Sequence, residues 1–508
     1  MAAISRMAAI VTRRKPQRAR TAALGLLGLA AAGCSLIPHY ERPSAPVPSE
    51  YPRQERAPAV SQPAAPKPAG PGEGVEVGTP GPTGAINSIG PAAEIRWRDI
   101  VAEPRLSRLV EIALEENRDL RAAALKVEQS QAQFRRTRSG LFPSVDLQMT
   151  DVRQRANTGF GAATSTAASV SVASTAYELD FFGRVRSSTE EALQQYLETD
   201  EARRSAQIAL VAEVVTQYFS LREAEEQLAL ARDTLANVQE SYRLNAIEFD
   251  VGEINELDLR TADGQVQSAR VNVLTYGRQT AQANDQLMEL VGVPELPADL
   301  PAATPFDQVP SLLADVPAGL PAELVERRPD ILEAEHALLA ANADIGVARA
   351  AFFPSISLTG SVGRSSTELS GLVGSTGARV WSFAPQLSLP LFSAGANRAN
   401  LDSARVAKDI AVANYERTIQ GAFREVADAL VAVSTYGDEI DTQRAAIDAQ
   451  ARRLALADVR YRQGEDSYLT VLSAQQDLYS AQQARLRAQF NRLSSQVSLY
   501  RALGGGWQ

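Results

Sequence analysis

Few side chains in this sequence could perform covalent or metal chemistry. The only cysteine is Cys34, and the only histidines are His39 and His336, so a zinc site of the usual Cys/His kind has almost no ligands. Paired carboxylates such as Glu225 and Glu226 lie in a helical pattern near arginines, and we interpret them as solvated. No nucleophile stands beside a candidate base. We therefore expect no catalytic residue, no metal site, no cofactor and no enzymatic activity.

Cys34 lies at the end of a predicted export signal. Basic residues precede an apolar run over 21–33, which is too short to cross a bilayer and is typical of a signal peptide. The stretch LAAAGCS is similar to a bacterial lipobox, although Ala31 stands where such motifs favour leucine. We predict that 1–33 is a lipoprotein signal peptide and that Cys34 is acylated. Ser35 after it indicates an outer-membrane address. The alternative is a buried structural cysteine.

Charged residues gather at two glycines, Gly252 and Gly464. Glycine suits a tight reversal with positive φ, so each is a candidate helical hairpin turn. The candidate functional residues around the two turns are Glu253, Glu256, Asp258, Arg460, Arg462, Glu465, Asp466, Tyr468, Leu469 and Ser473. The simplest interpretation is a pair of turns whose acids serve solubility.

The composition excludes one class of protein and favours long helices. The net charge is −9 and the pI is about 5.2, which argues against a nucleic-acid partner. Aromatic residues make up 6% of the 508 residues, which fits long helices better than a compact aromatic core.

The chain repeats itself after a proline-rich segment. Asp119 and Asp330 are 211 residues apart, and so are Pro143 and Pro354, which indicates duplicated architecture. Residues 38–91 hold 13 of the 27 prolines and cannot bury enough apolar surface to fold alone. The predicted organisation is a signal peptide at 1–33, a lipid-anchored tether at 34–96, a first repeat at 97–293, a joint at 294–321, a second repeat at 322–503 and a tail at 504–508.

The spacing of prolines and leucines predicts long helices in each repeat. Apolar residues recur every seven positions through residues 221–249 and again through 433–461, which favours coiled-coil packing. The helix predicted over 184–249 would be about 100 Å long at 1.5 Å per residue. Partner helices are predicted to return over 254–290 and 466–501.

Four shorter segments alternate between apolar and small or polar residues. They are residues 144–149, 169–179, 355–362 and 381–391, with polar loops predicted at 153–168 and 363–377. Such alternation is typical of a membrane β-barrel, although a soluble hairpin with one buried face would show it too. The smallest bacterial barrels have about eight strands, so four strands from one chain cannot close one. If these strands span a membrane, the chain must oligomerise.

This layout resembles the outer-membrane efflux proteins, the TolC/OprM/NodT-like channels, over nearly all of residues 97–504. The motifs that carry the resemblance are Trp97-Arg-Asp-Ile, Asn117-Arg-Asp-Leu, Asp180-Phe-Phe-Gly-Arg-Val-Arg, Ser388-Leu-Pro-Leu-Phe, Ala422-Phe-Arg-Glu-Val-Ala-Asp-Ala and Tyr468-Leu-Thr-Val-Leu.

The resemblance implies an α+β membrane protein that closes as a homotrimer. Three chains would form a twelve-stranded transmembrane β-barrel and a long coiled-coil α-helical barrel across the periplasm. Its implied role is an outer-membrane, lipid-anchored channel that exports drugs, other toxic compounds or metals. The implied partners are a periplasmic adaptor (membrane fusion protein), an inner-membrane pump, commonly of the resistance-nodulation-division class, and outer-membrane lipid.

In such a trimer the two turns would form the periplasmic gate. Each acid would meet its copies in a ring, and such a ring favours cations in a narrow pore. Ser473 and Gln476 replace an aspartate and an arginine that many lipoprotein members carry at the constriction. We therefore expect the tightest charged ring at Asp258 or Asp466, with an apolar ring near Leu469 as the alternative.

Two alternative functions remain open. One is an exit channel of the same fold that serves protein secretion. The other is a purely structural coiled-coil lipoprotein that links envelope layers, which the alternating strands argue against.

Overall fold

A computed structural model describes most of the chain. The described residues are 35–48, 97–101, 103–158, 161–309, 327–374 and 377–505. The predicted signal peptide, Cys34, much of the predicted tether, part of the predicted joint and the last three residues lie outside them.

The long helices occur in pairs of nearly equal length, 211 or 212 residues apart. They are α4 (Arg118–Ser139) and α7 (Pro329–Ala350), α5 (Arg184–Asp250) and α9 (Ala396–Arg462), and α6 (Glu256–Val291) and α10 (Tyr468–Ala502). Both α5 and α9 have 67 residues, which confirms the long helix predicted over 184–249. Within the described part of the chain, no helix combines the length and apolarity needed to cross a membrane. The remaining helical elements are α2 (Trp97–Ile100), α3 (Pro104–Glu116), η2 (Phe306–Gln308) and α8 (Ser370–Val373).

The chain divides into two compact units. The sheet unit comprises Met1–Pro43, Lys126–Thr199 and Ala334–Tyr415, and the hairpin unit comprises Ser44–Leu125, Asp200–Glu333 and Glu416–Gln508.

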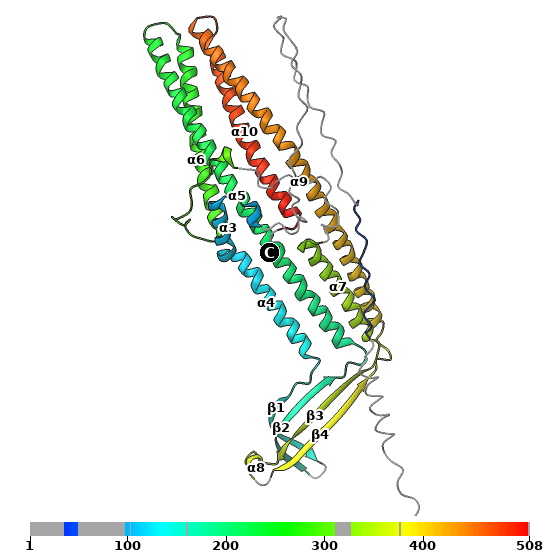
Figure 1. Ribbon diagram of the computed structural model, residues 1–508. Coiled ribbons are helices and arrows are strands. Elements are labelled where there is room, and N and C mark those ends of the chain that lie inside the picture. The colour runs from blue at the N-terminus through cyan, green and yellow to red at the C-terminus, as the bar shows by residue number, and fades with distance from the viewer. Residues whose placement is uncertain are drawn as a thin grey trace, which may run out of the picture. The chain divides into compact units, whose positions relative to one another are not determined.

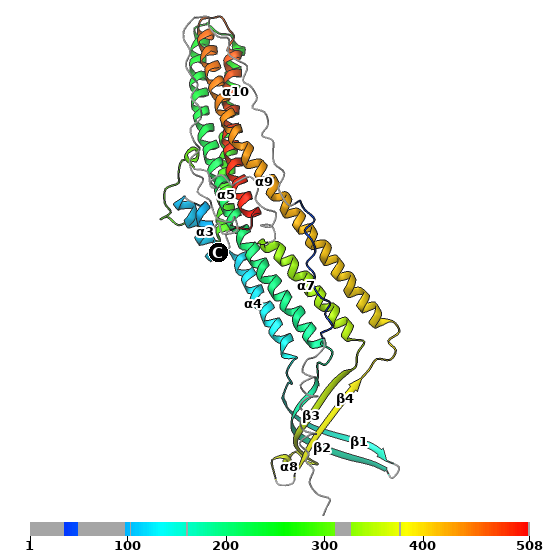
Figure 2. The same cartoon turned by 45° about the vertical axis from the view of Figure 1, so that its right-hand side comes forward.

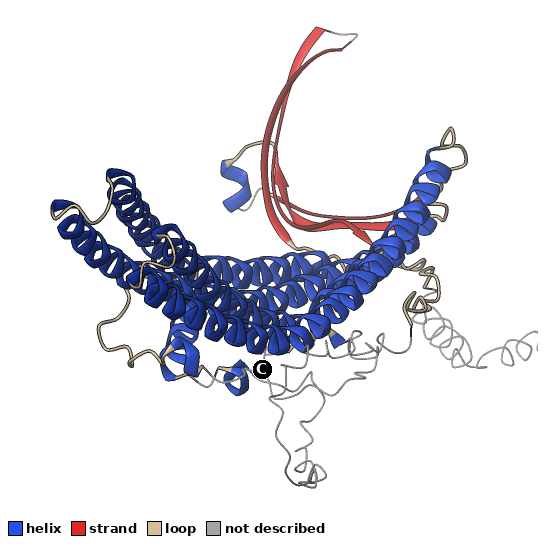
Figure 3. Cartoon of the chain, turned by 90° about the horizontal axis from the view of Figure 1, so that it is seen from above, coloured by secondary structure: helices blue, strands red, loops and turns tan. Residues whose placement is uncertain are grey.

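The sheet unit contains one antiparallel sheet with the strand order β1-β2-β3-β4. Its strands are β1 (Asp146–Thr158), β2 (Gly161–Glu178), β3 (Ser355–Ser366) and β4 (Ala378–Ser388). Viewed from above, the sheet is strongly curved (Figure 3). The four alternating segments are thus confirmed as strands, and β1 and β4 form the two edges of the described sheet.

The predicted loop over 153–168 is wrong, because β1 and β2 continue as paired strands up to Thr158 and Gly161. Polar and small residues occupy both faces there, so no alternation marks the strands, and backbone pairing alone extends the hairpin. The predicted loop over 363–377 is wrong at its start, where β3 continues to Ser366, and the rest contains α8.

On one face of the sheet, apolar side chains form a row across all four strands. A row of cross-strand partners on this face consists of Leu147, Val172, Val362 and Trp381. All four are exposed, from 44% for Val172 to 78% for Trp381. The neighbouring row, on the opposite face, consists of Asp146, Ala173, Ser361 and Ser382. Large apolar groups that face outward in this way need a covering other than this chain's own core.

Helices α4, α5 and α7 lie side by side in the sheet unit (Figures 1 and 2). The His336 ring nitrogen Nδ1 lies 2.7 Å from Oε1 of Gln194, and this contact ties α7 to α5. The carboxylate of Asp180 accepts the backbone N–H groups of Val185 and Arg186 and so caps the start of α5.

The described N-terminal segment, residues 35–43, is bound along α7. Arg349 donates to the carbonyl of Leu36 at 3.0 Å, and Asn342 donates to that of Pro38 at 2.9 Å. Glu335 accepts from Tyr40 at 3.0 Å and pairs with Arg42. The end of α7 nearest β3 therefore holds the residues that directly follow Cys34.

In the hairpin unit, the residues just before α4 and α7 are bound to the ends of α6 and α10 in two different ways. At the first junction, the Asn117 amide donates to the carbonyl of Leu290 at 2.9 Å. At the equivalent second junction, the Arg328 guanidinium donates to the carbonyl of Ala502 at 2.7 Å. Arg328 also pairs with Asp330 at 2.6 Å and with Glu425 at 3.0 Å.

Candidate functional site

The two predicted turns have the same backbone geometry. Gly252 and Gly464 adopt left-handed conformations with φ of +83° and +76°. Each glycine N–H donates a hydrogen bond to the carbonyl three residues earlier at 2.9 Å. The N–H of the residue after each glycine donates to the carbonyl five residues before that residue. This pattern is typical of helix C-termini that end at glycine. The turns join α5 to α6 and α9 to α10, and the two hairpins lie side by side (Figure 1).

The charges of the second turn are paired within its own hairpin. Two guanidinium nitrogens of Arg460 donate to the carboxylate of Asp466 at 2.6 and 3.2 Å, and a third lies 3.5 Å from Glu465. The hydrogen bond from Arg460 lowers the pKa of Asp466, against a smaller opposing effect of desolvation. Arg462 pairs with Asp458 on its own helix at 2.9 Å.

The first turn retains carboxylates without a cationic partner. Glu256 pairs with Arg260 one helical turn on, at 3.3 Å. The Asn255 side chain accepts the Asp258 backbone N–H at 3.0 Å and so caps α6. Among the described residues, neither Glu253 nor Asp258 has an ion-pair partner. The two turns therefore differ in net charge although their backbones match.

Tyr468 is a packing residue beneath the turns, since its side chain is only 6% exposed. It packs with Ala262 of α6 and Ala457 of α9, and its ring centroid lies 5.3 Å from that of Tyr461. Burial raises the pKa of Tyr461 to about 12, helped by Glu248, which accepts its hydroxyl at 3.4 Å. This cluster joins the two hairpins just behind their turns.

Ser473 lies next to an ion pair that the sequence did not reveal. Arg453 of α9 pairs with Asp477 and donates to the Ser473 hydroxyl at 3.4 Å. Asp477 lies one helical turn after Ser473, on the same face of α10, and this spacing is the signal that could have indicated it. A carboxylate, that of Asp477, therefore lies one helical turn away from Ser473, the residue that stands where the family resemblance implies an aspartate.

Leu469 is exposed, and so is its repeat counterpart Leu257, which no motif in the sequence marks. They are 68% and 74% exposed and lie 212 residues apart, two positions inside their helices. Within the described ranges, no group of three or more histidine, cysteine, aspartate or glutamate side chains could hold a metal ion.

Comparison with known proteins gives one consistent result. The family model for outer membrane efflux proteins matches residues 109–293 and 320–505. The toluene efflux pump outer membrane protein TtgF of Pseudomonas putida is 44% identical over 484 residues, which cover 95% of this chain and 96% of that protein. Outer membrane protein OprJ of Pseudomonas aeruginosa is 43% identical over 486 residues, covering 95% of each chain.

A solved structure agrees with these matches. The crystal structure of the open state of the Neisseria gonorrhoeae MtrE outer membrane channel aligns with a TM-score of 0.77 at 37% identity. That alignment covers 94% of this chain and 99% of the MtrE chain.

Proposed function

Because this chain belongs to the outer membrane efflux protein family, and is therefore an outer-membrane efflux channel, we propose that it is the exit duct of a tripartite pump. Its proposed partners are a periplasmic adaptor and an inner-membrane pump of the resistance-nodulation-division class. Its proposed cargo is small toxic molecules, since relatives are named for the efflux of toluene, solvents and antibiotics.

The apolar row across the four strands is the observation that carries this proposal. A face that presents Leu147, Val172, Val362 and Trp381 outward is suited to lipid, and the opposite face of small and polar residues is suited to a water-filled lumen. The backbone N–H and C=O groups of an unpaired edge strand would lack hydrogen bonds in lipid, and the free-energy cost would be prohibitive. Strand β1 of one copy must therefore pair with β4 of the next. Three copies would close a barrel of twelve strands.

The proposed test is reconstitution of the purified full-length chain. We expect heat-modifiable, detergent-resistant trimers in outer-membrane fractions and stepwise ion conductance in planar bilayers. A water-soluble, stable monomer would contradict both the barrel and the channel. A purely structural lipoprotein would need neither trimers nor conductance.

The cargo is tested by deleting the gene and exposing cells to a panel of solvents, antibiotics, dyes and metals. Increased sensitivity that the intact gene restores would support small-molecule efflux. If sensitivity is unchanged and an exported protein is instead retained in the cell, the secretion alternative is favoured.

The lipid anchor is proposed at Cys34, and the binding of residues 36–42 along α7 supports it, because that segment would hold the anchor beside the sheet. Cys34→Ala should abolish acyl labelling. An unmodified mature N-terminus at another residue, detected by mass spectrometry, would contradict the anchor.

We propose that the turn region is the periplasmic gate. The pairing of Arg460 with Asp466 inside one hairpin means that a link to a neighbouring chain would first have to replace this pair. Adaptor binding could open a gate built from such exposed links, because salt and water weaken each of them.

A further inference from the structure

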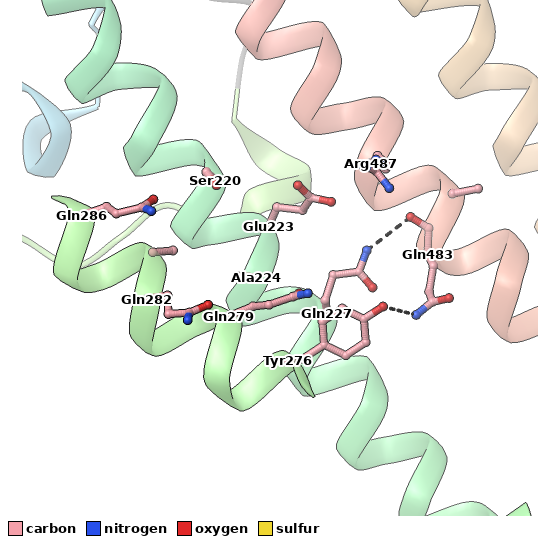
Figure 4. A pocket seen from close by; sticks show the side chains of 12 residues that line it. Ser220, Glu223, Ala224, Gln227, Tyr276, Gln279, Gln282, Gln286, Gln483 and Arg487 are labelled. Carbon is pink, nitrogen blue, oxygen red and sulfur yellow. Dashed lines mark hydrogen bonds between the residues drawn. The ribbon is translucent and has the colours of Figure 1, made fainter. Parts of the chain in front are cut away.

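A polar cavity of about 620 Å³ lies between α5, α6 and α10 in the hairpin unit (Figure 4). Its size is in the range of small-ligand sites, but most such sites are lined mainly by apolar side chains. Here five carboxamides line the cavity: Gln227, Gln279, Gln282, Gln286 and Gln483. The cavity therefore suits a ligand rich in hydrogen-bonding groups.

The floor of the cavity contains an unused hydrogen-bond acceptor. Gln227 is only 6% exposed, and its amide nitrogen donates to the backbone carbonyl of Gln483 at 3.4 Å. Its amide oxygen is buried and has no hydrogen-bond partner among the described residues. The side chain of Gln483 donates to the hydroxyl of Tyr276 at 2.6 Å, as Figure 4 shows. Buried acceptors in folded proteins are almost always paired, so this oxygen is available to a donor that enters the cavity.

Two opposite charges line the same cavity without pairing with each other. Glu223 comes from α5 and Arg487 from α10, and neither has an ion-pair partner among the described residues. Burial raises the pKa of Glu223, while the charge of Arg487 and a hydrogen bond from the Gln227 side chain lower it. Burial raises the pKa of Tyr276, the charge of Glu223 raises it further, and the charge of Arg487 lowers it. A carboxylate and a guanidinium that form no ion pair among the described residues thus line one cavity and are available to one ligand.

The equivalent cavity in the second repeat shows that the helical frame does not require this lining. That cavity, of about 340 Å³, lies between α9 and α10. At the positions 212 residues after Gln279, Gln282 and Gln286 it has Asn491, Ser494 and Ser498. The counterparts of Glu223 and Arg487 are both threonines, at positions 435 and 275.

We propose that the cavity between α5, α6 and α10 binds a small zwitterion of the amino-acid or short-peptide class. The ligand's ammonium group pairs with Glu223, and its carboxylate pairs with Arg487. Its peptide groups exchange hydrogen bonds with the glutamine carboxamides, each of which offers a donor and an acceptor. This site requires only the fold of the hairpin unit and does not depend on the cargo or partners proposed above.

The test is calorimetric titration of the full-length protein in detergent with the dipeptide alanyl-glutamine. We expect saturable binding with a dissociation constant of about 1 mM. The N-acetylated dipeptide lacks the ammonium group, and the dipeptide amide lacks the carboxylate. Each should bind about tenfold more weakly, which corresponds to the loss of one charge pair.

Glu223→Gln and Arg487→Gln identify which end of the ligand each residue binds. Glu223→Gln should bind the free and the N-acetylated dipeptide equally and still discriminate against the amide. Arg487→Gln should do the reverse. Glu226→Gln and Arg485→Gln, on the same helices but outside the cavity lining, should bind like the unmodified protein.

The absence of saturable binding would overturn the proposal. So would binding that is unchanged in both cavity variants, or variants that fold normally by circular dichroism and lose both discriminations together. None of these outcomes would affect the channel proposal, which is tested by trimers and conductance.

Discussion

The two repeats share their helices and turns but differ in the polar contacts that hold them. In the first repeat, an uncharged amide, Asn117, ties α4 to the end of α6, and the turn at Gly252 retains unpaired acids. In the second repeat, Arg328 makes the equivalent link, and Arg460 pairs with the acids of its turn. The backbone therefore follows from features common to both copies, whereas charge is free to diverge. Substitutions at shared features should have equal effects in the two repeats, and those at divergent features should not.

The largest effects are expected on the apolar sheet face, where the repeats are alike. Leu147→Arg in β1 and Leu387→Arg in β4 should each destabilise the assembled barrel by about 2–4 kcal/mol if they lie near the membrane midplane. The measurement is the yield of detergent-resistant trimers. Gln386→Arg is the matched control on the opposite face and should leave trimers intact. Equal losses for Gln386→Arg and Leu387→Arg would contradict the assignment of the faces.

Substitutions at the two junctions, those of Asn117 and Arg328, should reduce stability by unequal amounts. Arg328→Met leaves the carboxylates of Asp330 and Glu425 without their partner, and both are about one-third exposed, so we expect a loss of about 2–3 kcal/mol. The Asn117 side chain also accepts the Leu120 backbone N–H at 2.9 Å and so caps α4. Asn117→Ala removes this cap and the hydrogen bond to Leu290 and should cost about 1–2 kcal/mol. The readout is the apparent unfolding temperature in detergent. The exposed neighbour Arg327→Met should have almost no effect, and a larger loss for Asn117→Ala would contradict this comparison.

Equal effects are expected again at the turn glycines. Gly252→Ala and Gly464→Ala place a side chain at positive φ, with no atom within 4 Å of the new carbon, so only backbone strain of about 1–2 kcal/mol opposes them. Gly264→Ala, in the open middle of α6, should stabilise by about 0.5–1 kcal/mol. Thermal unfolding in detergent measures all three, and a stabilising change at either turn would argue against the left-handed conformation.

Substitutions at the two turns should differ in a smaller effect, their influence on ion selectivity. Glu253→Ala with Asp258→Ala removes two carboxylates that lack ion-pair partners, so the preference for cations should weaken. Arg460→Ala with Asp466→Ala removes a neutral pair and should change the preference little. Reversal potentials in a potassium chloride gradient across a planar bilayer measure both. If selectivity is the same in all three proteins, the constriction lies elsewhere, for example at Leu257 and Leu469.

The smallest effect concerns the protonation of Asp466. Its pKa is lowered from the ordinary value of 3.8 by the hydrogen bond from Arg460. The pair therefore contributes fully above pH 3.8 and is lost only as the pH falls through the lower pKa of the folded state. Arg460→Gln should return the pKa of Asp466 to about its ordinary value, which a carboxyl NMR titration would detect. A shift that persists in this variant would have another cause.

The two turns show which features can be predicted from a few neighbouring residues in the sequence. Glycine and the surrounding charges correctly indicated reversals near Gly252 and Gly464, because a tight turn is a property of a few consecutive residues. The ion pair behind the second turn could not be predicted. Arg453 and Asp477 are 24 residues apart in the chain, and only the packing of α9 against α10 brings them together. The burial of Tyr468, which stays a predicted gate residue, likewise depends on the packing of these helices.

The sequence by itself determined the helices, the alternating strands and the duplication. Proline-free runs, seven-residue spacing and two-residue alternation act over short distances, which is why α5 begins and ends within one residue of its predicted bounds. Tertiary structure decided which distant charges pair, such as Arg453 with Asp477 and Arg328 with Glu425, and which polar groups line the cavity beside Gln227. Those features depend on residues far apart in the chain, and no periodic pattern specifies which of several chemically equivalent partners a folded backbone brings within hydrogen-bonding distance.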